Sequence, residues 1–187
     1  MKKLETISKE YLEQNVQLHK KGFGGGGYKN LPVLLPILKG YQVESLLDYG
    51  AGQRTLTAQL KNLILEGEIH DFFLEDYDPA IPDISEYPEG QFHIVTCTDV
   101  LEHIEAEYID NVLQNIFNLS HQLAFLVIHC LPANKILPDG RNAHISQHQP
   151  EWWEAKLAQY EWTIKDKALR GDKETGLIKK VTYLMEK

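Results

Sequence analysis

The residue types that could do chemistry are concentrated in one short run and one long loop. Asp99, Glu102 and His103 follow the apolar run 92–98, and a helix beginning near Asp99 would place all three side chains on one face. His144 lies in a long polar loop, and loops of this length inside a compact domain are usually functional. The four side chains offer the mixed oxygen and nitrogen ligands of a hard or borderline divalent cation. The alternative is that Asp99 caps the helix, Glu102 is exposed and His103 packs.

A turn with two glycines follows the first strongly apolar run of the chain. In Asp48-Tyr-Gly-Ala-Gly52 the glycines allow the backbone to approach a ligand, and the helix expected next offers free N–H groups. A Walker phosphate loop needs Gly-Lys-Ser/Thr here, and Thr55 stands where a dinucleotide fingerprint has its third glycine. Asp48 would repel a pyrophosphate but suits a cationic amine. The turn therefore predicts a cofactor site for a cationic ligand, with an ordinary strand-to-helix turn as the alternative.

Further polar groups come at the ends of other predicted strands. His129 ends the most strand-like run, and an imidazole with its ordinary pKa of about 6.5 can take a proton from a hydroxyl or amine. We expect His129 and His144 to be the catalytic residues, although a hydrogen-bonded core histidine is an alternative for His129. Asp76 and Asp78 end the second predicted strand, where a carboxylate can accept two O–H donors at once.

Alternating strands and helices are needed to bring these residues together. Apolar runs predict strands over 43–48, 68–77, 92–98, 122–129, 162–169 and 176–185, and helical spacing predicts helices over 8–21, 31–38, 55–65, 105–119 and 150–160. This order indicates an α/β sandwich with a largely parallel sheet. The last two strands are too close in sequence for a crossover helix and should pair antiparallel. Ligands bind such sheets at the carboxyl ends of the strands, where the polar residues above are expected.

Two motifs resemble those of class I S-adenosylmethionine-dependent methyltransferases. Leu46-Leu-Asp-Tyr-Gly-Ala-Gly52 is similar to the first motif of that family, Val100-Leu-Glu-His-Ile104 is similar to the motif after its fourth strand, and the resemblance covers about residues 43–150. It implies a three-layer Rossmann-like fold, with a mostly parallel sheet of six or seven strands and an antiparallel C-terminal hairpin. It also implies that S-adenosylmethionine is bound by Asp48, Tyr49, Gly50, Ala51, Gly52, Asp78, Thr98 and Asp99. In that family the acid at Asp78, with Asp76 as the fallback, accepts both ribose hydroxyls.

The polar cluster is also similar to two metal-using branches of this fold. One branch methylates the 2′-hydroxyl at the ends of small RNAs, and the other O-methylates ubiquinone precursors. The resemblance implies Mg²⁺ or Mn²⁺ bound by Asp99, Glu102, His103 and His144. The first position is Asp rather than Glu here, which shortens its reach by one methylene. The loop around Gly140-Arg-Asn-Ala-His144 looks like the substrate loop of phage-type methyltransferases.

Two features depart from the pattern of that family. Arg54 stands where many members carry a third glycine. The stretch between Asp78 and Phe92 is too short and too rich in proline for the usual helix and third strand. A sheet of six strands is therefore expected, and Asp83 is not assigned to an adenine pocket.

The N-terminal part of the chain is predicted to form a separate lid. Four consecutive glycines, 24–27, lie between the first two predicted helices and would permit movement. In similar methyltransferases an N-terminal helix and loop fold over the cofactor and exclude water. We expect residues 1–40 to be a helical lid with a glycine-rich loop and residues 41–187 to be the cofactor-binding methyltransferase domain; a flexible connector is the alternative.

The composition limits the remaining function classes. The chain has 187 residues, and its 19 basic and 27 acidic side chains give a net charge of −8, which argues against a general nucleic-acid binder. Two cysteines, no secretory signal and no long apolar run predict a cytoplasmic protein without a membrane segment. The expected activity is methyl transfer from S-adenosylmethionine to an oxygen or nitrogen of a small molecule. The alternatives are metal-assisted 2′-O-methylation of RNA ends and a non-catalytic binding protein of the same fold.

Overall fold

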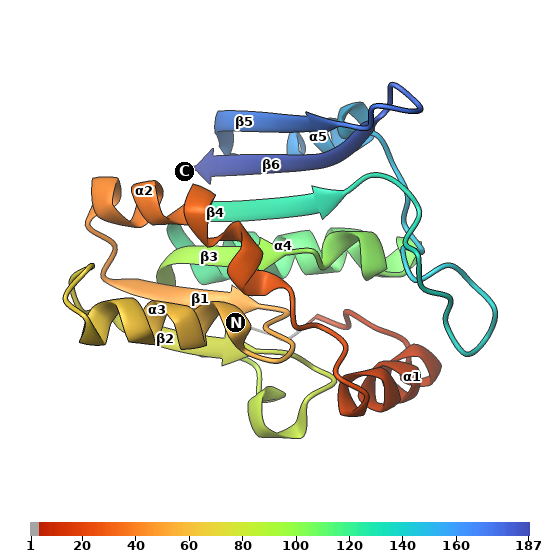
Figure 1. Cartoon of the computed structure of the whole chain (residues 1–187), viewed down its shortest axis with the longest axis horizontal. Coiled ribbons are helices and arrows are strands. Elements are labelled where there is room, and N and C mark those ends of the chain that lie inside the picture. The colour runs from red at the N-terminus through yellow and green to blue at the C-terminus, as the bar shows by residue number, and fades with distance from the viewer. Residues whose placement is uncertain (1–3) are drawn as a thin grey trace.

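The computed structural model describes residues 4–187, so residues 1–3 of the predicted lid lie outside it. A six-stranded sheet lies between two layers of helices, with the strand order β2–β1–β3–β4–β6–β5 (Figure 1). The strands are β1 (Ser45–Tyr49), β2 (Phe73–Tyr77), β3 (Phe92–Thr98), β4 (Ser120–His129), β5 (Thr163–Gly171) and β6 (Ile178–Glu186). The helices are α1 (Lys9–Lys20), α2 (Leu31–Tyr41), α3 (Thr55–Leu65), α4 (Ile109–Leu119) and α5 (Pro150–Leu157).

The pairing of the strands confirms the predicted α/β class. β1 to β4 are parallel, and β6 is antiparallel to both β4 and β5. Between β2 and β3 the chain forms only the short 3₁₀ turn Pro82–Ile84. The sheet therefore has six strands, with the antiparallel hairpin at its C-terminal end.

Alternate residues of the central strands enter two separate cores. Leu46 and Ile94 pack with α2 and α3 on one face, whereas Leu47 and Val95 pack with α4 and α5 on the other. β3 and β4 are buried on both faces, which explains why their sequences are apolar almost throughout. All of the parallel strands point toward one edge, where α1 and the loop 130–149 also lie (Figure 1).

Two predicted elements differ from the structure for local reasons. The strand predicted over 68–77 begins only at Phe73, because the preceding residues close the end of α3. Gly67 is left-handed (φ 72°), its N–H bonds to Ile64 O, and the Glu68 N–H bonds to Leu63 O, as in a Schellman cap. The helix predicted over 105–119 begins as α-helix only at Ile109.

No α-helix begins at Asp99. Asp99 adopts a left-handed conformation (φ 57°), and only a single 3₁₀ turn, Leu101–His103, follows it. Asp99, Glu102 and His103 consequently do not share one face of an α-helix. They come together because the chain turns sharply at the end of β3.

No helix in the part of the chain that the structure describes has the length and apolar character needed to cross a membrane.

Candidate active site

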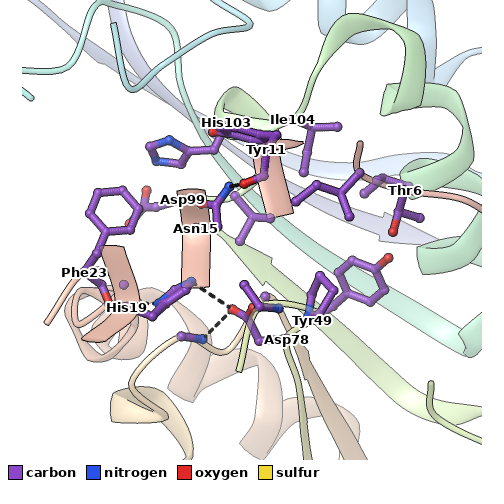
Figure 2. Close-up of a pocket in the computed structure, with 18 residues that line it drawn as sticks. Thr6, Tyr11, Asn15, His19, Phe23, Tyr49, Asp78, Asp99, His103 and Ile104 are labelled. Atoms are coloured by element: carbon purple, nitrogen blue, oxygen red, sulfur yellow. Dashed lines mark hydrogen bonds and ion pairs between the residues drawn. The ribbon is translucent and has the colours of Figure 1, made fainter. Parts of the chain in front are cut away.

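A cavity opens at the carboxyl edge of the sheet, beneath α1 (Figure 2). It holds about 670 Å³ of empty space, some of it open to solvent. The ends of the first three strands contribute Gly50, Asp78 and Asp99, and α1 contributes Tyr11 and His19. The apolar part of the lining consists of Pro79, Ala80, Val100, Ile104 and Val112. The cavity therefore combines an apolar wall with a few polar groups, as small-molecule sites do.

The glycine loop, residues 49–54, has a backbone that larger residues could not adopt. Gly50 has a φ of 81°, and a Cβ added there would lie 2.5 Å from Cγ2 of Val100. The Gly50 N–H donates to Tyr77 O (2.7 Å), which ties the loop to the end of β2. Gly52 has a φ of 52°, and a Cβ added there would collide with the carbonyl oxygen of Gly24. Glycine is needed at both positions for conformation and for close approach.

Asp48 lies beneath the glycine loop. Its side chain is buried, and Oδ1 accepts a hydrogen bond from Thr96 Oγ1 (2.9 Å). Burial raises the pKa of Asp48 to about 7; the Thr96 hydrogen bond works against this shift, and the neighbouring Asp76 and Asp78 add to it. The predicted cofactor residues Ala51 and Thr98 are buried as well, whereas Tyr49, Gly50 and Gly52 line the cavity.

Asp78 presents its carboxylate to the cavity. Oδ1 accepts from the Ala80 N–H (2.9 Å) and Oδ2 from the Gly52 N–H (3.1 Å), so each oxygen keeps a lone pair. His19 Nε2 of α1 lies 3.7 Å from Oδ2. Of the two acids predicted for this strand end, Asp78 lines the cavity, and Asp76 pairs with Asp48 in the register of β1 and β2.

Glu102, His103 and His144 form one cluster of potential metal ligands. One ligand atom from each lies within 4.8 Å of the others. Glu102 is fully buried, Oε1 accepts from the His129 N–H (3.2 Å), and Oε2 has no hydrogen-bond partner among residues 4–187. Burial, reinforced by Asp99, raises the pKa of Glu102 to about 8. A buried carboxylate oxygen without a partner is costly unless a proton or a cation accompanies it.

The two histidines of this cluster are held in a tautomer that leaves Nε2 able to bind a metal. His103 Nδ1 lies 2.6 Å from Ala143 O, and His144 Nδ1 lies 2.6 Å from Leu131 O. Because a carbonyl oxygen only accepts, each Nδ1 carries the proton and each neutral ring has its lone pair on Nε2. Burial lowers the pKa of His103 to about 4, with a smaller contribution from His144, so this ring is neutral at neutral pH.

Asp99 belongs to a second, overlapping cluster with Glu102 and His129. Its Oδ1 lies 3.3 Å from His129 Nε2 and 3.2 Å from Lys180 Nζ, and Lys180 also donates to Asn30 Oδ1 (3.0 Å). Burial lowers the pKa of His129, while the charge of Asp99 opposes this shift. The structure therefore brings His129 close to the predicted ligands and adds Lys180 and Asn30, which the sequence analysis did not identify.

The contact between Lys180 and His129 has a sequence signal that could have been used. The two residues are opposite one another in the antiparallel register of β4 and β6. Side chains of opposed residues lie on the same face of a sheet. A correct register of the last strand against β4 would therefore have placed Lys180 beside His129. No comparable signal leads to Asn30, which precedes α2.

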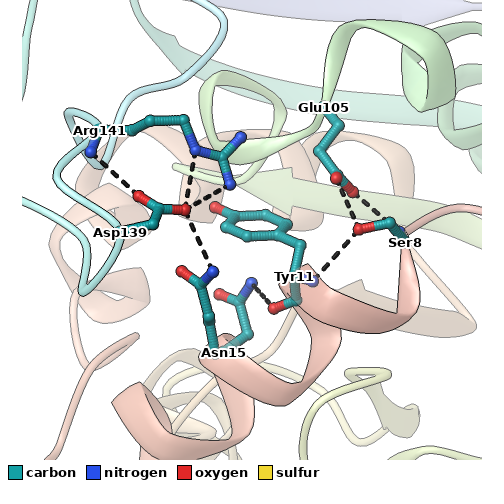
Figure 3. Close-up of polar contacts among 7 residues, drawn as sticks. Ser8, Tyr11, Asn15, Glu105, Asp139 and Arg141 are labelled. Carbon is teal, nitrogen blue, oxygen red and sulfur yellow. Dashed lines mark hydrogen bonds and ion pairs between the residues drawn. The ribbon is translucent and has the colours of Figure 1, made fainter.

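The loop that carries His144 is held against α1 (Figure 3). Gln14 Nε2 donates to Asp139 Oδ2 (3.1 Å), and the Arg141 guanidinium lies 5.3 Å from the centre of the Tyr11 ring. Glu105 accepts from both the N–H (2.8 Å) and the hydroxyl (2.7 Å) of Ser8, the N-cap of α1. α1 therefore contacts the loop on one side, and it covers the cavity on the other.

Comparisons with known proteins give a match in structure only. The sequence matches no family model and no curated protein. The methyltransferase domain of bacterial CtHen1-CN is 13% identical, with a TM-score of 0.59 over 86% of this chain and 98% of that one. The 1,6-didemethyltoxoflavin-N1-methyltransferase of Burkholderia thailandensis, with 1,6-didemethyltoxoflavin and S-adenosylhomocysteine bound, is 16% identical, with a TM-score of 0.57 over 100% of this chain and 93% of that one.

A third solved structure is the magnesium protoporphyrin IX methyltransferase of Synechocystis PCC 6803 with bound S-adenosylhomocysteine. It is 12% identical, with a TM-score of 0.56 over 98% of this chain and 90% of that chain. At such identities the likeness concerns the fold. The mixed six-stranded sheet, with its antiparallel C-terminal hairpin, is the Rossmann-like fold of the methyltransferases.

Proposed function

We propose that the protein transfers a methyl group from S-adenosylmethionine to an oxygen or nitrogen atom of a small molecule. The observation that carries this proposal is the cavity lined by Gly50, Gly52 and Asp78, at the carboxyl edge of a methyltransferase-like sheet. The three structural neighbours described above are methyltransferases by name, and two of them contain S-adenosylhomocysteine. One also contains its small-molecule substrate, 1,6-didemethyltoxoflavin.

The residues of the cavity fit this cofactor by their chemistry. Asp78 keeps a free lone pair with which its carboxylate can accept from a ribose hydroxyl, and Val100 and Ile104 would provide an apolar wall for adenine. The positive φ of Gly50 lets the backbone turn beneath the amino-acid part, above the buried carboxylate of Asp48. When bound, S-adenosylmethionine supplies an electrophilic methyl group on a sulfonium. The chain orients the acceptor atom, excludes water beneath α1 and removes a proton.

His129 and His144 are the groups that we propose for this proton transfer. His144 offers the lone pair of Nε2, because its Nδ1 bonds to Leu131 O. His129 Nε2 faces Asp99, whose carboxylate stabilises the protonated ring. Neither histidine lines the cavity itself. His129 contacts Asp99, and the His144 ring lies 4.9 Å from the His103 ring; Asp99 and His103 both line the cavity. The centroids of the His129 and His144 rings are 5.5 Å apart.

A metal-assisted reaction, including 2′-O-methylation of an RNA end, is the second candidate. It is favoured by the partnerless Oε2 of Glu102 and by the Nδ1-protonated rings of His103 and His144. These three residues, with Asp99 close by, would hold Mg²⁺ or Mn²⁺, which lowers the pKa of a substrate hydroxyl. Titration with Mn²⁺ should show binding in wild type and at least tenfold weaker binding in Glu102→Gln. An RNA substrate is excluded if micromolar RNA does not bind at low salt, where phosphate contacts are strongest.

A thermal-shift titration tests the cofactor assignment. S-adenosylhomocysteine should raise the unfolding midpoint of the wild type with increasing concentration, because it binds only the native state. ATP and NAD should raise it much less at the same concentration, because the carboxylates of Asp78 and Asp99 line the cavity and would repel their phosphates. No shift with S-adenosylhomocysteine would refute the proposal. Binding without methyl transfer to a broad panel of acceptors would instead favour a non-catalytic binding protein.

A further inference from the structure

One face of α1 is directed into the cavity. Tyr11, Asn15 and His19 are each four residues apart, Phe23 continues the spacing just beyond the helix, and all four line the cavity (Figure 2). Residues four apart lie above one another on a helix. Tyr11 and Phe23 offer aromatic rings, whereas His19 is the member of this face that approaches a carboxylate.

The ring of His19 is held in one orientation. Its Nδ1 lies 3.1 Å from Phe23 O, and because this carbonyl only accepts, Nδ1 carries the proton. In the neutral ring, Nε2 is then a hydrogen-bond acceptor. The backbone is fixed as well, since Gln53 Nε2 donates to both His19 O (3.0 Å) and Phe23 O (3.1 Å). The glycine loop thus holds the end of α1 in place.

Close packing of glycines determines how near His19 comes to the loop. The Gln53 N–H donates to Gly24 O (3.1 Å), and an added Cβ on Gly24 would lie 2.9 Å from Cε1 of His19. Gly52 in turn accommodates the backbone of Gly24. Side chains at these glycines would displace the imidazole from Asp78. His19 therefore belongs to the same tightly packed unit as the glycine loop.

His19 and Asp78 present two acceptors to the same space. Nε2 and Oδ2 are 3.7 Å apart, beyond hydrogen-bond distance, and the two side chains are only 12% and 9% exposed. Oδ2 already accepts from the Gly52 N–H, so its remaining lone pair needs a donor from elsewhere. A ligand with two adjacent hydroxyl groups supplies one donor to each residue. A ribose diol has this arrangement.

We propose that His19 is a cofactor-binding residue that accepts a hydrogen bond from one ribose hydroxyl of S-adenosylmethionine, while Asp78 accepts from the other. This assignment rests on the proposed function, because it takes the cavity to be the cofactor site. It gives α1 a direct role in recognising the ligand in addition to covering it.

Calorimetric titration with S-adenosylhomocysteine tests the role of His19. His19→Ala should bind about five- to tenfold more weakly than wild type, which corresponds to the loss of one hydrogen bond. His19→Gln, whose amide oxygen can take the place of Nε2, should recover at least half of that loss on a logarithmic scale. His121→Ala, at the exposed amino-terminal end of β4, should bind like the wild type. Circular dichroism and unfolding midpoints of the variants establish that they are folded.

Cofactor analogues identify the hydroxyl group that His19 contacts. The 2′-deoxy and 3′-deoxy forms of S-adenosylhomocysteine should each bind the wild type more weakly. One of the two analogues lacks the hydroxyl that His19 contacts. His19→Ala should therefore not weaken the binding of that analogue any further, because the hydrogen bond is already missing. Equal losses with all three ligands would overturn the proposal. Unchanged binding by His19→Ala would also overturn the proposal. Tighter binding would overturn it too, because it would mean that His19 competes with the ligand for Asp78.

The same titrations separate this proposal from the function on which it rests. If the wild type does not bind S-adenosylhomocysteine, the cofactor site itself is refuted. If the wild type binds and His19→Ala binds equally well, only the role of His19 is refuted.

Discussion

Replacement of Asp48 by asparagine should change how stability depends on pH. The Asp48 side chain is only 3% exposed, and it accepts a hydrogen bond from Thr96. Burial raises its pKa from 3.8 to about 7. The asparagine side chain of the variant would keep the acceptor oxygen for Thr96 and would have no charge to desolvate. The variant therefore isolates the cost of a buried negative charge beneath the glycine loop.

The magnitude follows from the shift in pKa. In the unfolded chain Asp48 loses its proton near pH 4, whereas in the folded protein it keeps the proton to about pH 7. Between these values the folded state binds more protons, so its stability falls as pH rises. A shift of about 3 units, at about 1.4 kcal/mol per unit, gives a loss on the order of 4 kcal/mol. Stability from this group is fully present below pH 4 and is lost as pH passes through 7.

Urea unfolding of wild type and Asp48→Asn at a series of pH values measures this effect. The free energy of unfolding of the variant, minus that of the wild type, should increase by about 4 kcal/mol from pH 4 to pH 8 and then level off. Other groups titrate similarly in both proteins, so their contributions largely cancel in the difference. A difference that stays constant within about 1 kcal/mol over this range would refute the argument that Asp48 is desolvated.

Four further predictions concern the loop, the core, the ligand cluster and the lid. Gly50→Ala should lower the free energy of unfolding in urea by about 2 kcal/mol or more, because the added Cβ meets Val100 at a position with positive φ. Gly67→Ala also has a positive φ but has open space around it, and it should lower the free energy of unfolding by only about 1 kcal/mol. Equal losses in the two variants would contradict the steric argument. Trp153→Ala removes a fully buried side chain and should lower the free energy of unfolding by about 3–5 kcal/mol, and a loss under about 1 kcal/mol would show that the site is not packed as described. Glu102→Gln should weaken Mn²⁺ binding at least tenfold in calorimetry, whereas Glu107→Gln, at an exposed position, should bind Mn²⁺ like the wild type. Equal Mn²⁺ affinities of wild type and Glu102→Gln would show that Glu102 is not a metal ligand. Glu105→Ala should raise the hydrogen-exchange rates of the α1 amides several-fold, because it removes the two hydrogen bonds that Ser8 donates to Glu105. Glu107→Ala should leave these rates unchanged. The same rates in both variants would show that the contact between Ser8 and Glu105 does not hold α1 in place.

The spacing of apolar residues was sufficient to predict those helices and strands whose ends are not changed by an adjacent cap or turn. The helix at Thr55–Leu65 and the strand at Phe92–Thr98 have the predicted bounds, because their apolar spacing is regular and their ends are marked by polar residues. The start of β2 was not predictable from apolar content, because the cap after α3 uses part of the apparent strand. Asp99 likewise breaks the helical pattern by its left-handed backbone, which no spacing rule reveals.

The same distinction applies to the site. Gly50 and Asp78 could be placed at one edge from sequence, because the carboxyl ends of parallel strands meet there. His19 and Lys180 could not, because their positions depend on how α1 and the C-terminal hairpin pack against residues distant in sequence. Sequence patterns describe one element at a time, whereas these contacts join elements. The assignment of individual residues to cofactor, metal and proton transfer remains a prediction for experiment.

Hydrogen exchange with and without S-adenosylhomocysteine tests the central claim, that the cavity beneath α1 is the cofactor site. The account predicts slower exchange at saturating ligand in the glycine loop (49–54), in the turn after β2 (78–81) and in α1, because these segments surround the cavity. The exposed strand β5 should be unaffected. Ligand binding with protection confined to segments outside the cavity, or no protection at all, would contradict the account.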